Sequence, residues 1–196
     1  MTFPNPTFDG VPTEQWLDGL HAESKYNTKH ILSAFAYFGI PSSFLDVGCG
    51  DGTMVNIARK LGVEAYGIDQ LVQPDWPTYF FHHNLVDAFR LPEPVDMVFC
   101  TEVAEHIHES AHSTLMDTLI ENMKSGSQAR LIFTAAHPGQ DGTGHVATRS
   151  AFYWRTEFTA RGLTFHRIDT INLALLWTNI ESALGHLAAN LQVFEK

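Results

Sequence analysis

The segment Phe44-Leu45-Asp46-Val47-Gly48-Cys49-Gly50-Asp51-Gly52 decides the fold class of this 196-residue chain. A short apolar run ends in an acid and then breaks into glycines at alternate positions. Because glycine lacks a Cβ atom, its backbone adopts positive φ and exposes N–H groups that a side chain would shield from a ligand. The pattern predicts a buried strand over residues 43–47 that turns sharply into a helix around a ligand.

A second strand with an acid at its carboxyl end follows over residues 62–69, Gly-Val-Glu-Ala-Tyr-Gly-Ile-Asp. In open α/β sheets an acid at this place hydrogen-bonds the ribose hydroxyls of a nucleotide-like ligand. Asp46 and Asp69 are therefore expected at neighbouring strand ends on one edge of a sheet.

Composition and charge restrict the class of protein. A chain of this length with 44% hydrophobic residues predicts a single domain over residues 1–196. The net charge of −10 argues against a nucleic-acid partner, because such affinity depends on clustered Lys and Arg, and favours a small-molecule substrate.

Cys49 and Cys100 show no CxxC spacing, and we see no signal peptide or membrane-spanning run, so we expect a reduced, cytoplasmic protein without membrane contact. Nothing in the sequence indicates the oligomeric state.

Strand and helix patterns alternate along most of the chain. Residues 1–12 are rich in Pro, Gly and Asn and are expected to be flexible, and residues 13–40 predict a helical cap. The alternation predicts an α/β fold with a doubly wound, mostly parallel sheet covered on both faces. We expect strands at 43–47, 64–68, 79–83, 95–100, 129–135, 163–169 and 190–195, and helices at 52–61, 110–124, 149–161 and 171–184.

The order of these features resembles the class I S-adenosylmethionine-dependent methyltransferases. Residues 45–52 resemble the first motif of that family, and Gly67-Ile68-Asp69 resembles its acid-ended second strand. Phe81-His82-His83-Asn84-Leu85 stands where the family contacts adenine, and residues 96–106 resemble its fourth strand and the turn after it. The resemblance implies a seven-stranded Rossmann-like sheet with an antiparallel last strand, S-adenosyl-L-methionine as the cofactor, and methyl transfer.

The resemblance also implies a set of cofactor-binding residues. Asp46 and the glycine turn would hold the cationic methionine end, Asp69 the ribose hydroxyls, and Asn84 the adenine edge. A dinucleotide-binding domain is the main alternative, but it uses G-x-G-x-x-G, and Asp46 and Asp51 would repel a pyrophosphate. The full set of predicted cofactor residues is Asp46, Gly48, Cys49, Gly50, Asp69, Gln70, Asn84, Leu85, Thr101 and Glu102.

Three histidines are candidates for a catalytic base, which methyl transfer needs when the acceptor is a hydroxyl or a protonated amine. His106 follows the fourth strand, and His137 and His145 bound a glycine-rich loop after the fifth strand, at the edge where such sheets bind ligands. A histidine without a catalytic role is the alternative for each. We expect His108 and His112 to face solvent.

The tract Glu102-x-x-Glu105-His106 places three side chains at helical spacing on one face, where they could ligate a divalent metal. With His145 as a further ligand, it resembles the metal site of the methyltransferases that modify the 2′-hydroxyl at the 3′ end of small RNAs. The same tract is widespread in class I enzymes that need no metal, and we therefore predict no metal.

The sequence thus predicts methyl transfer to oxygen or nitrogen of a small molecule, such as a sugar or another metabolite. A metal-assisted RNA 2′-O-methyltransferase and a non-catalytic cofactor-binding regulatory subunit are the alternatives. In the helix after the glycine-rich loop, Tyr153, Trp154 and Phe158 could wall a substrate pocket, although aromatic residues at this spacing are more often core.

Overall fold

The computed structural model describes residues 28–179 and 185–196. The segment expected to be flexible, residues 1–12, lies outside them, as do residues 13–27 of the expected helical cap. Residues 28–38 are helical and end at Gly39, whose φ of 91° is the left-handed conformation common after a helix.

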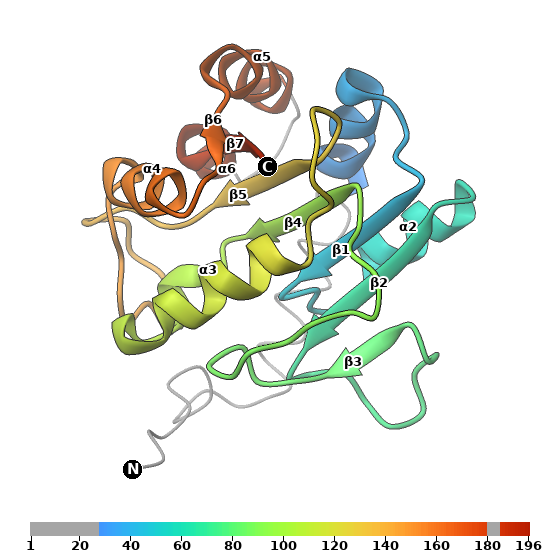
Figure 1. Ribbon diagram of the computed structural model, residues 1–196. Helices are drawn as coiled ribbons and strands as arrows, with labels where there is room; N and C mark the ends of the chain where they lie inside the picture. The colour runs from blue at the N-terminus through green and yellow to red at the C-terminus, as the bar shows by residue number, and fades with distance from the viewer. Residues whose placement is uncertain (1–27, 180–184) are drawn as a thin grey trace.

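The described elements alternate as the sequence predicts (Figure 1). The strands are β1 (Ser43–Val47), β2 (Glu64–Asp69), β3 (Phe80–His82), β4 (Met97–Thr101), β5 (Arg130–Thr134), β6 (Thr164–Phe165) and β7 (Gln192–Glu195). The helices are α2 (Thr53–Lys60), α3 (His112–Glu121), α4 (Ala151–Ala160), α5 (Arg167–Thr178) and α6 (Gly185–Asn190), with short 3₁₀ turns η1 (Ala104–His106) and η2 (Glu109–Ala111).

The strands form one seven-stranded sheet in the order β3-β2-β1-β4-β5-β7-β6. Strands β1 to β5 pair in parallel, whereas β7 is antiparallel to both β5 and β6. The predicted doubly wound sheet with an antiparallel last strand is therefore confirmed. The segments that follow β1, β2, β4 and β5 all leave the sheet at one edge, because parallel strands end on the same side.

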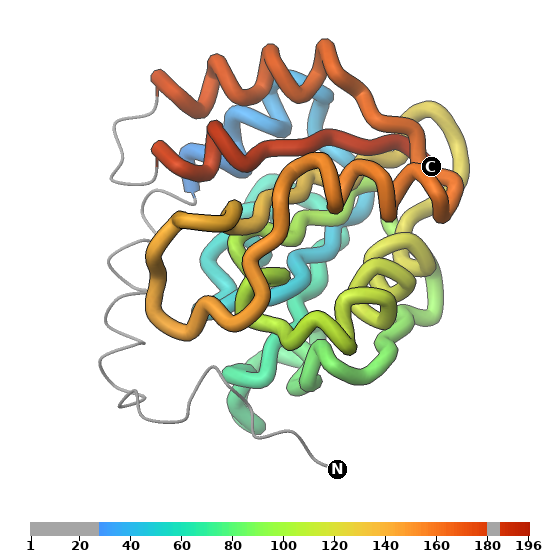
Figure 2. Tube along the Cα trace, turned by 90° about the vertical axis from the view of Figure 1, so that its left-hand side faces the viewer, coloured from blue at the N-terminus to red at the C-terminus, as the bar shows by residue number. Residues whose placement is uncertain are grey.

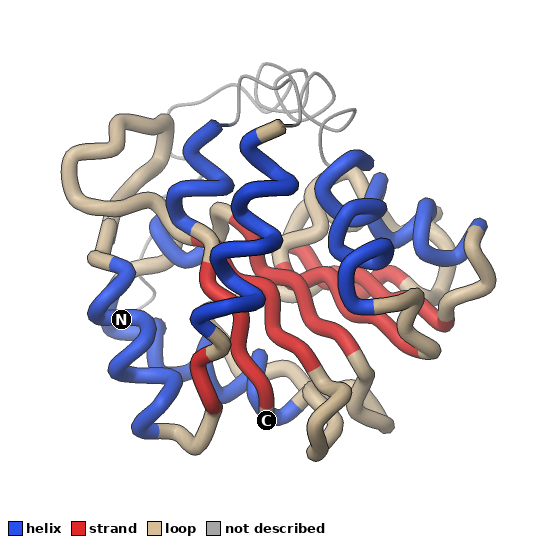
Figure 3. The backbone as a smooth tube through the Cα atoms, turned by 90° about the horizontal axis from the view of Figure 1, so that it is seen from above, coloured by secondary structure: helices blue, strands red, loops and turns tan. Residues whose placement is uncertain are grey.

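Helices cover both faces of the sheet (Figure 3). On one face, Leu115 of α3 and Trp154 and Phe158 of α4 are buried in a hydrophobic cluster with β4 and β5. On the other face, helix 28–38, α2, α5 and α6 form a second buried cluster with β1 and β5. Trp154 and Phe158 thus belong to the core, where full burial of such a side chain contributes about 1.5–3 kcal/mol. Tyr153 is partly buried against the same cluster.

The C-terminal part differs from the prediction in two places. The expected strand over 163–169 is wrong beyond Phe165, because α5 begins at Arg167. Leu173 and Trp177 are one helical turn apart and both are buried in the second cluster, which favours a helix here over an extended edge strand. Asn190, expected to begin the last strand, instead ends α6, a helix that the sequence analysis missed. Figure 2 shows α5 lying alongside α6 and β7.

No helix within residues 28–179 and 185–196 combines the length and the apolar character that crossing a membrane requires.

Candidate active site

The glycine turn after β1 has the geometry that its sequence predicts. Gly48, Gly50 and Gly52 have φ values of 79°, 53° and 74°, all left-handed. A Cβ atom on Gly48 would lie 2.3 Å from Val103 Cγ2, and one on Gly52 would lie 2.5 Å from Phe80 Cζ. These positions therefore need glycine for both backbone conformation and space.

Asp69 joins the end of β2 to this turn. Its Oδ2 accepts a hydrogen bond from the Gly50 N–H at 3.0 Å, and its Oδ1 accepts one from the Leu71 N–H at 2.9 Å. Burial raises the pKa of the carboxyl group, and these backbone hydrogen bonds act in the opposite direction. The carboxylate thus lies against the glycine turn, and its contact with the ribose hydroxyls stays a prediction.

Asp46 is the most unusual group at this edge. Its side chain is 1% exposed, and neither carboxylate oxygen has a hydrogen-bond partner in the described part of the chain. Burial, and then the charges of Asp69 and Asp51, raise the pKa of Asp46 well above its usual value of 3.8. A buried carboxylate without a partner is costly. A cationic ligand beside the turn would supply the missing partner, so the site fits the cationic methionine end of S-adenosylmethionine.

Three further residues of the predicted cofactor set, Gln70, Asn84 and Leu85, follow β2 and β3. Gln70 and Leu85 are half-buried, and Asn84, the predicted adenine contact, is exposed. The Asn84 Oδ1 accepts a hydrogen bond from the Val86 N–H at 3.2 Å. Their contact with the cofactor stays a prediction.

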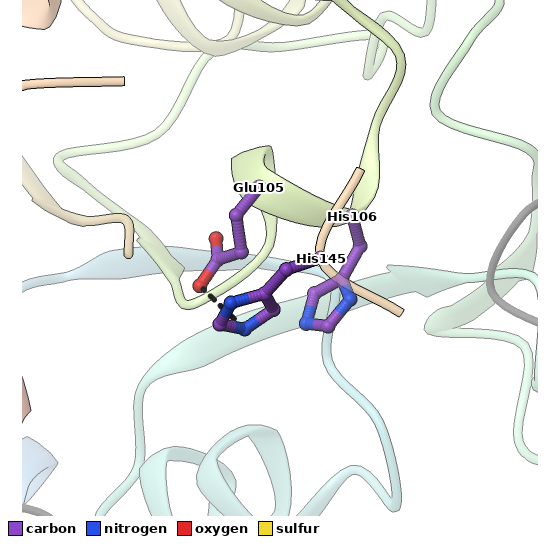
Figure 4. Close-up of side chains that lie close together, drawn as sticks. All are labelled: Glu105, His106 and His145. Carbon is purple, nitrogen blue, oxygen red and sulfur yellow. Dashed lines mark ion pairs between the residues drawn. The ribbon is translucent and has the colours of Figure 1, made fainter. Parts of the chain in front are cut away.

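Glu105, His106 and His145 come together at the carboxyl ends of β4 and β5 (Figure 4). Each residue places one potential ligand atom within 4.8 Å of the others. Glu105 is fully buried, with its Oε1 accepting a hydrogen bond from the Ala136 N–H at 3.1 Å and lying 4.0 Å from His145 Nε2. Burial, and then the charge of Glu102, raise the pKa of Glu105 to about 8.

Backbone carbonyls fix the tautomers of the two histidines. His145 Nδ1 lies 3.1 Å from the Gln140 carbonyl, and His106 Nδ1 lies 3.1 Å from the Gly144 carbonyl. Because a carbonyl oxygen only accepts hydrogen bonds, each Nδ1 carries the proton and each neutral ring keeps its lone pair on Nε2. Burial also lowers the pKa of His106, which favours the neutral ring. The cluster therefore presents basic imidazole nitrogens beside a carboxyl group.

The other histidines considered from the sequence lie elsewhere. His137 is exposed, with Nδ1 3.0 Å from the Pro138 carbonyl, and is not part of this cluster. His108 is exposed as expected, but the prediction for His112 is wrong, because that side chain is 1% exposed. Its Nε2 lies 2.9 Å from the Ile107 carbonyl and 3.2 Å from the Ala104 carbonyl, so the ring holds the segment between η1 and α3 together.

Glu102 follows Thr101 at the end of β4 and belongs to a network that the sequence analysis missed. It is the one non-glycine residue with positive φ (53°) in the described part of the chain. Its Oε2 accepts a hydrogen bond from Gln140 Nε2 at 3.2 Å, and its Oε1 accepts one from Asn190 Nδ2 at 3.2 Å. His186 Nε2 lies 3.7 Å from the same carboxylate. No local pattern marks Gln140, Asn190 or His186, because their partners are distant in sequence.

Comparison with known proteins agrees with the fold. A family model described as a methyltransferase domain matches residues 19–179. The chain belongs to this methyltransferase family. It is an S-adenosylmethionine-dependent methyltransferase, and the resemblance drawn from the motifs is confirmed.

Two curated relatives match part of this methyltransferase. Probable tRNA (uracil-O(2)-)-methyltransferases from Caenorhabditis briggsae and Caenorhabditis elegans are 33% identical over 66 residues and 42% identical over 56 residues. These segments cover 34% and 29% of this chain but only 11% and 9% of the relatives. The chain thus spans about a tenth of the length of these relatives.

Solved structures share the fold at low identity. An O-methyltransferase family protein from Burkholderia thailandensis superposes with a TM-score of 0.63 and 13% identity, covering 92% of this chain and 57% of that one. The 1,6-didemethyltoxoflavin-N1-methyltransferase from the same organism, solved with 1,6-didemethyltoxoflavin and S-adenosylhomocysteine, has a TM-score of 0.59 and 16% identity, covering 76% and 73%. At these identities the likeness shows the fold.

Proposed function

We propose that this methyltransferase transfers the methyl group of S-adenosylmethionine to a hydroxyl oxygen of a small molecule, such as a sugar or another metabolite. The observation that carries the proposal is the orientation of His145. Its Nδ1–H is held by the Gln140 carbonyl, and its Nε2 lone pair lies 4.0 Å from the buried Glu105 carboxyl group. Histidine is the side chain best suited to accept a hydroxyl proton near neutral pH, and a fixed Nδ1–H leaves Nε2 as the accepting nitrogen.

The glycine turn and the two acids beside it would hold the cofactor, which supplies a methyl group on a cationic sulfur. Asp46 would meet the cationic end of the methionine moiety with its two unpaired oxygens. Asp69 would accept from the ribose hydroxyls, and Asn84 would meet the adenine edge. Methyl transfer then needs the acceptor oxygen in line with the methyl group, which is mainly a matter of positioning.

The overall charge supports a small acceptor. A net charge of −10 at pH 7 repels a phosphate backbone, whereas a neutral polyhydroxylated molecule is unaffected by it. Burial, and then the charge of Glu102, raise the pKa of Glu105 to about 8, so this carboxyl group keeps its own proton near neutral pH and adds no negative charge beside His145.

A panel of small hydroxyl and amine acceptors, assayed with cofactor carrying a labelled methyl group, tests the proposal. His145→Gln should lower transfer to a hydroxyl acceptor by about 10²- to 10⁴-fold, the usual contribution of a general base, and leave S-adenosylhomocysteine binding unchanged. His108→Gln is the control, because that ring is exposed and outside the cluster. Transfer only to amines, or full activity of His145→Gln, would refute a hydroxyl acceptor deprotonated by His145.

A second candidate function is metal-assisted methyl transfer to an RNA 2′-hydroxyl. The observation that favours it is the geometry of Glu105, His106 and His145, whose ligand atoms lie within 4.8 Å of one another. Histidine nitrogens held by backbone carbonyls on the far side of the ring are typical of metal ligands. The partial match to probable tRNA methyltransferases adds support.

Chelator treatment separates the two candidates. If a metal is required, activity should fall after treatment with EDTA and return on addition of Mn²⁺ or Mg²⁺, and Glu105→Ala should abolish transfer while cofactor binding persists. Chelator-resistant transfer to a small hydroxyl acceptor would reject the metal-assisted route.

A further inference from the structure

Gln140 contacts both the predicted base, His145, and residues at the ends of β4 and α6. Its backbone carbonyl lies 3.1 Å from His145 Nδ1. Its side-chain amide donates to Glu102 Oε2 at 3.2 Å, and its Oε1 accepts from Asn190 Nδ2 at 2.9 Å. One residue thus contacts the imidazole through its main chain, and the ends of β4 and α6 through its side chain.

We propose that Gln140 is a positioning residue for the methyl-transfer site. Clamped by Glu102 and Asn190, it holds its backbone carbonyl where it fixes the ring plane and the tautomer of His145. This inference rests on the proposed function of His145 as the base and adds the residues that orient it. None of the three residues needs to touch the acceptor for the clamp to act.

The first half of the loop is joined to the sheet end by the Ala136 N–H, which donates to Glu105 Oε1 at 3.1 Å, and by the side chain of Gln140. Residues 135–150 contain no helix or strand, and Gly139 and Gly144 have left-handed φ values of 92° and 78°. The second half is fixed by the backbone, because the Val146 and Ala147 N–H groups donate to the Glu105 carbonyl at 2.9 and 3.1 Å. The side chain of Gln140 provides the corresponding anchor before His145.

The three side chains satisfy one another in a closed triangle. Asn190 Nδ2 donates to both Glu102 Oε1 and Gln140 Oε1, and Gln140 Nε2 donates to Glu102 Oε2. Asn190 is 5% exposed, so its amide is held in a largely water-free position. Glu102 also has a left-handed φ of 53°, a strained conformation that persists where the surrounding structure constrains it.

A rescue experiment can test the triangle, because its three hydrogen bonds can still form when the carboxylate of residue 102 and the amide of residue 140 are exchanged. In Gln140→Glu, two carboxylates face each other and the donor to Glu102 is lost. In the double variant Glu102→Gln with Gln140→Glu, the amide at 102 can donate to the carboxylate at 140, and Asn190 still donates to an oxygen on each side. The double variant therefore restores all three hydrogen bonds and the net charge of the triangle, with the carboxylate at position 140 instead of 102.

The direct measurement is the ring ¹⁵N spectrum of His145, with the assignment made from a His145→Gln sample. We expect the wild-type protein to show the single Nδ1–H tautomer, and Gln140→Ala and Gln140→Glu to show exchange between tautomers. The double variant should recover the single tautomer. Gln128→Ala is the control, because Gln128 is an exposed glutamine in a different loop.

Kinetics provide the second measurement. Gln140→Ala should lower kcat by about 10- to 100-fold, the range expected when a reacting group moves by about 1 Å, with KM for the cofactor within about twofold of wild type. Gln140 is half-buried on a loop, and the double variant tests the same contact without truncation.

Two results would overturn the inference: a single Nδ1–H tautomer that persists in Gln140→Ala, or a double variant that fails to recover the His145 signal lost in Gln140→Glu. Both are independent of turnover. If the wild-type protein methylated no hydroxyl acceptor, the proposed function would fail while the spectra would still decide the role of Gln140.

Discussion

Replacing Asp46 by Asn should change stability and cofactor affinity in opposite directions. The carboxylate is 1% exposed and has no hydrogen-bond partner in the described part of the chain, and burial raises its pKa. A carboxyl group whose pKa is raised by folding costs nothing below its usual pKa of 3.8, and it destabilises the fold as pH rises toward its folded pKa. An amide stays neutral at every pH. The cofactor-free variant should therefore be more stable than wild type at neutral pH, and the two should converge near pH 3.

Cofactor affinity should fall in the same variant. Each unpaired oxygen of Asp46 can accept a hydrogen bond from the cationic methionine end, and hydrogen bonds to charged groups contribute about 1.5–3 kcal/mol. Loss of that amount raises Kd by about 10- to 150-fold. Calorimetric titration with S-adenosylmethionine measures this change, and urea denaturation of the cofactor-free protein between pH 3 and pH 8 measures the free energy of unfolding.

Asp96→Asn is the matched control for this experiment. Asp96 precedes β4, at the opposite edge of the sheet, and accepts hydrogen bonds from the Ser43 N–H and hydroxyl and from Lys124 Nζ. Burial alone would raise its pKa, but the hydrogen bonds from Lys124 and Ser43 outweigh burial and lower it. Its stabilising contribution is complete above the usual pKa and is lost as pH falls through the folded pKa. This control should lose about 1 kcal/mol at neutral pH and bind cofactor normally.

An Asp46→Asn protein that is less stable than wild type at pH 7 and binds S-adenosylmethionine with unchanged affinity would refute this reasoning. That result would mean that the carboxylate has a structural partner and does not face the cofactor.

Three further substitutions test separate parts of the site. Gly142→Ala would place a Cβ atom 2.2 Å from His145 Nε2 and displace the ring. A displacement of about 1 Å should lower the kcat of this variant by about 100-fold, and an unchanged kcat would contradict this. Its melting temperature should stay close to wild type, because a side-chain tip can move. In Gly48→Ala the new Cβ atom would lie 2.3 Å from Val103 Cγ2, at a residue with a φ of 79°. Urea denaturation should show that the free energy of unfolding falls by about 1–3 kcal/mol. Asp69→Ala should weaken cofactor binding by about 1.5–3 kcal/mol, and unchanged affinity in calorimetry would count against the ribose contact.

Much of the sheet edge that carries the glycine turn could be predicted from local sequence. Glycines at alternate positions predict a turn with positive φ, and Gly48, Gly50 and Gly52 all adopt positive φ. The proximity of Asp46 and Asp69 could also be predicted, because they lie at the carboxyl ends of apolar runs and parallel strands bring these ends to one edge of the sheet. The sequence places His106 and His145 at one edge of the sheet, and the metal-site resemblance brings them together with Glu105, as the structure does. The position of His137 outside this cluster cannot be predicted from the loop sequence.

The sequence by itself determined the parallel sheet, the glycine turn and the positions of its acids, because apolar runs, glycine and strand-terminal carboxylates act within a few residues. Only the tertiary structure decided which polar groups meet. Glu102 and Asn190 are separated by 88 residues, and Glu102 and Gln140 by 38, yet they form one triangle. The start of α5 and the helix α6 also depended on burial of Leu173, Trp177 and Leu187 against the sheet. Contacts of this range depend on how helices pack on the sheet, and no local pattern of residues encodes that packing.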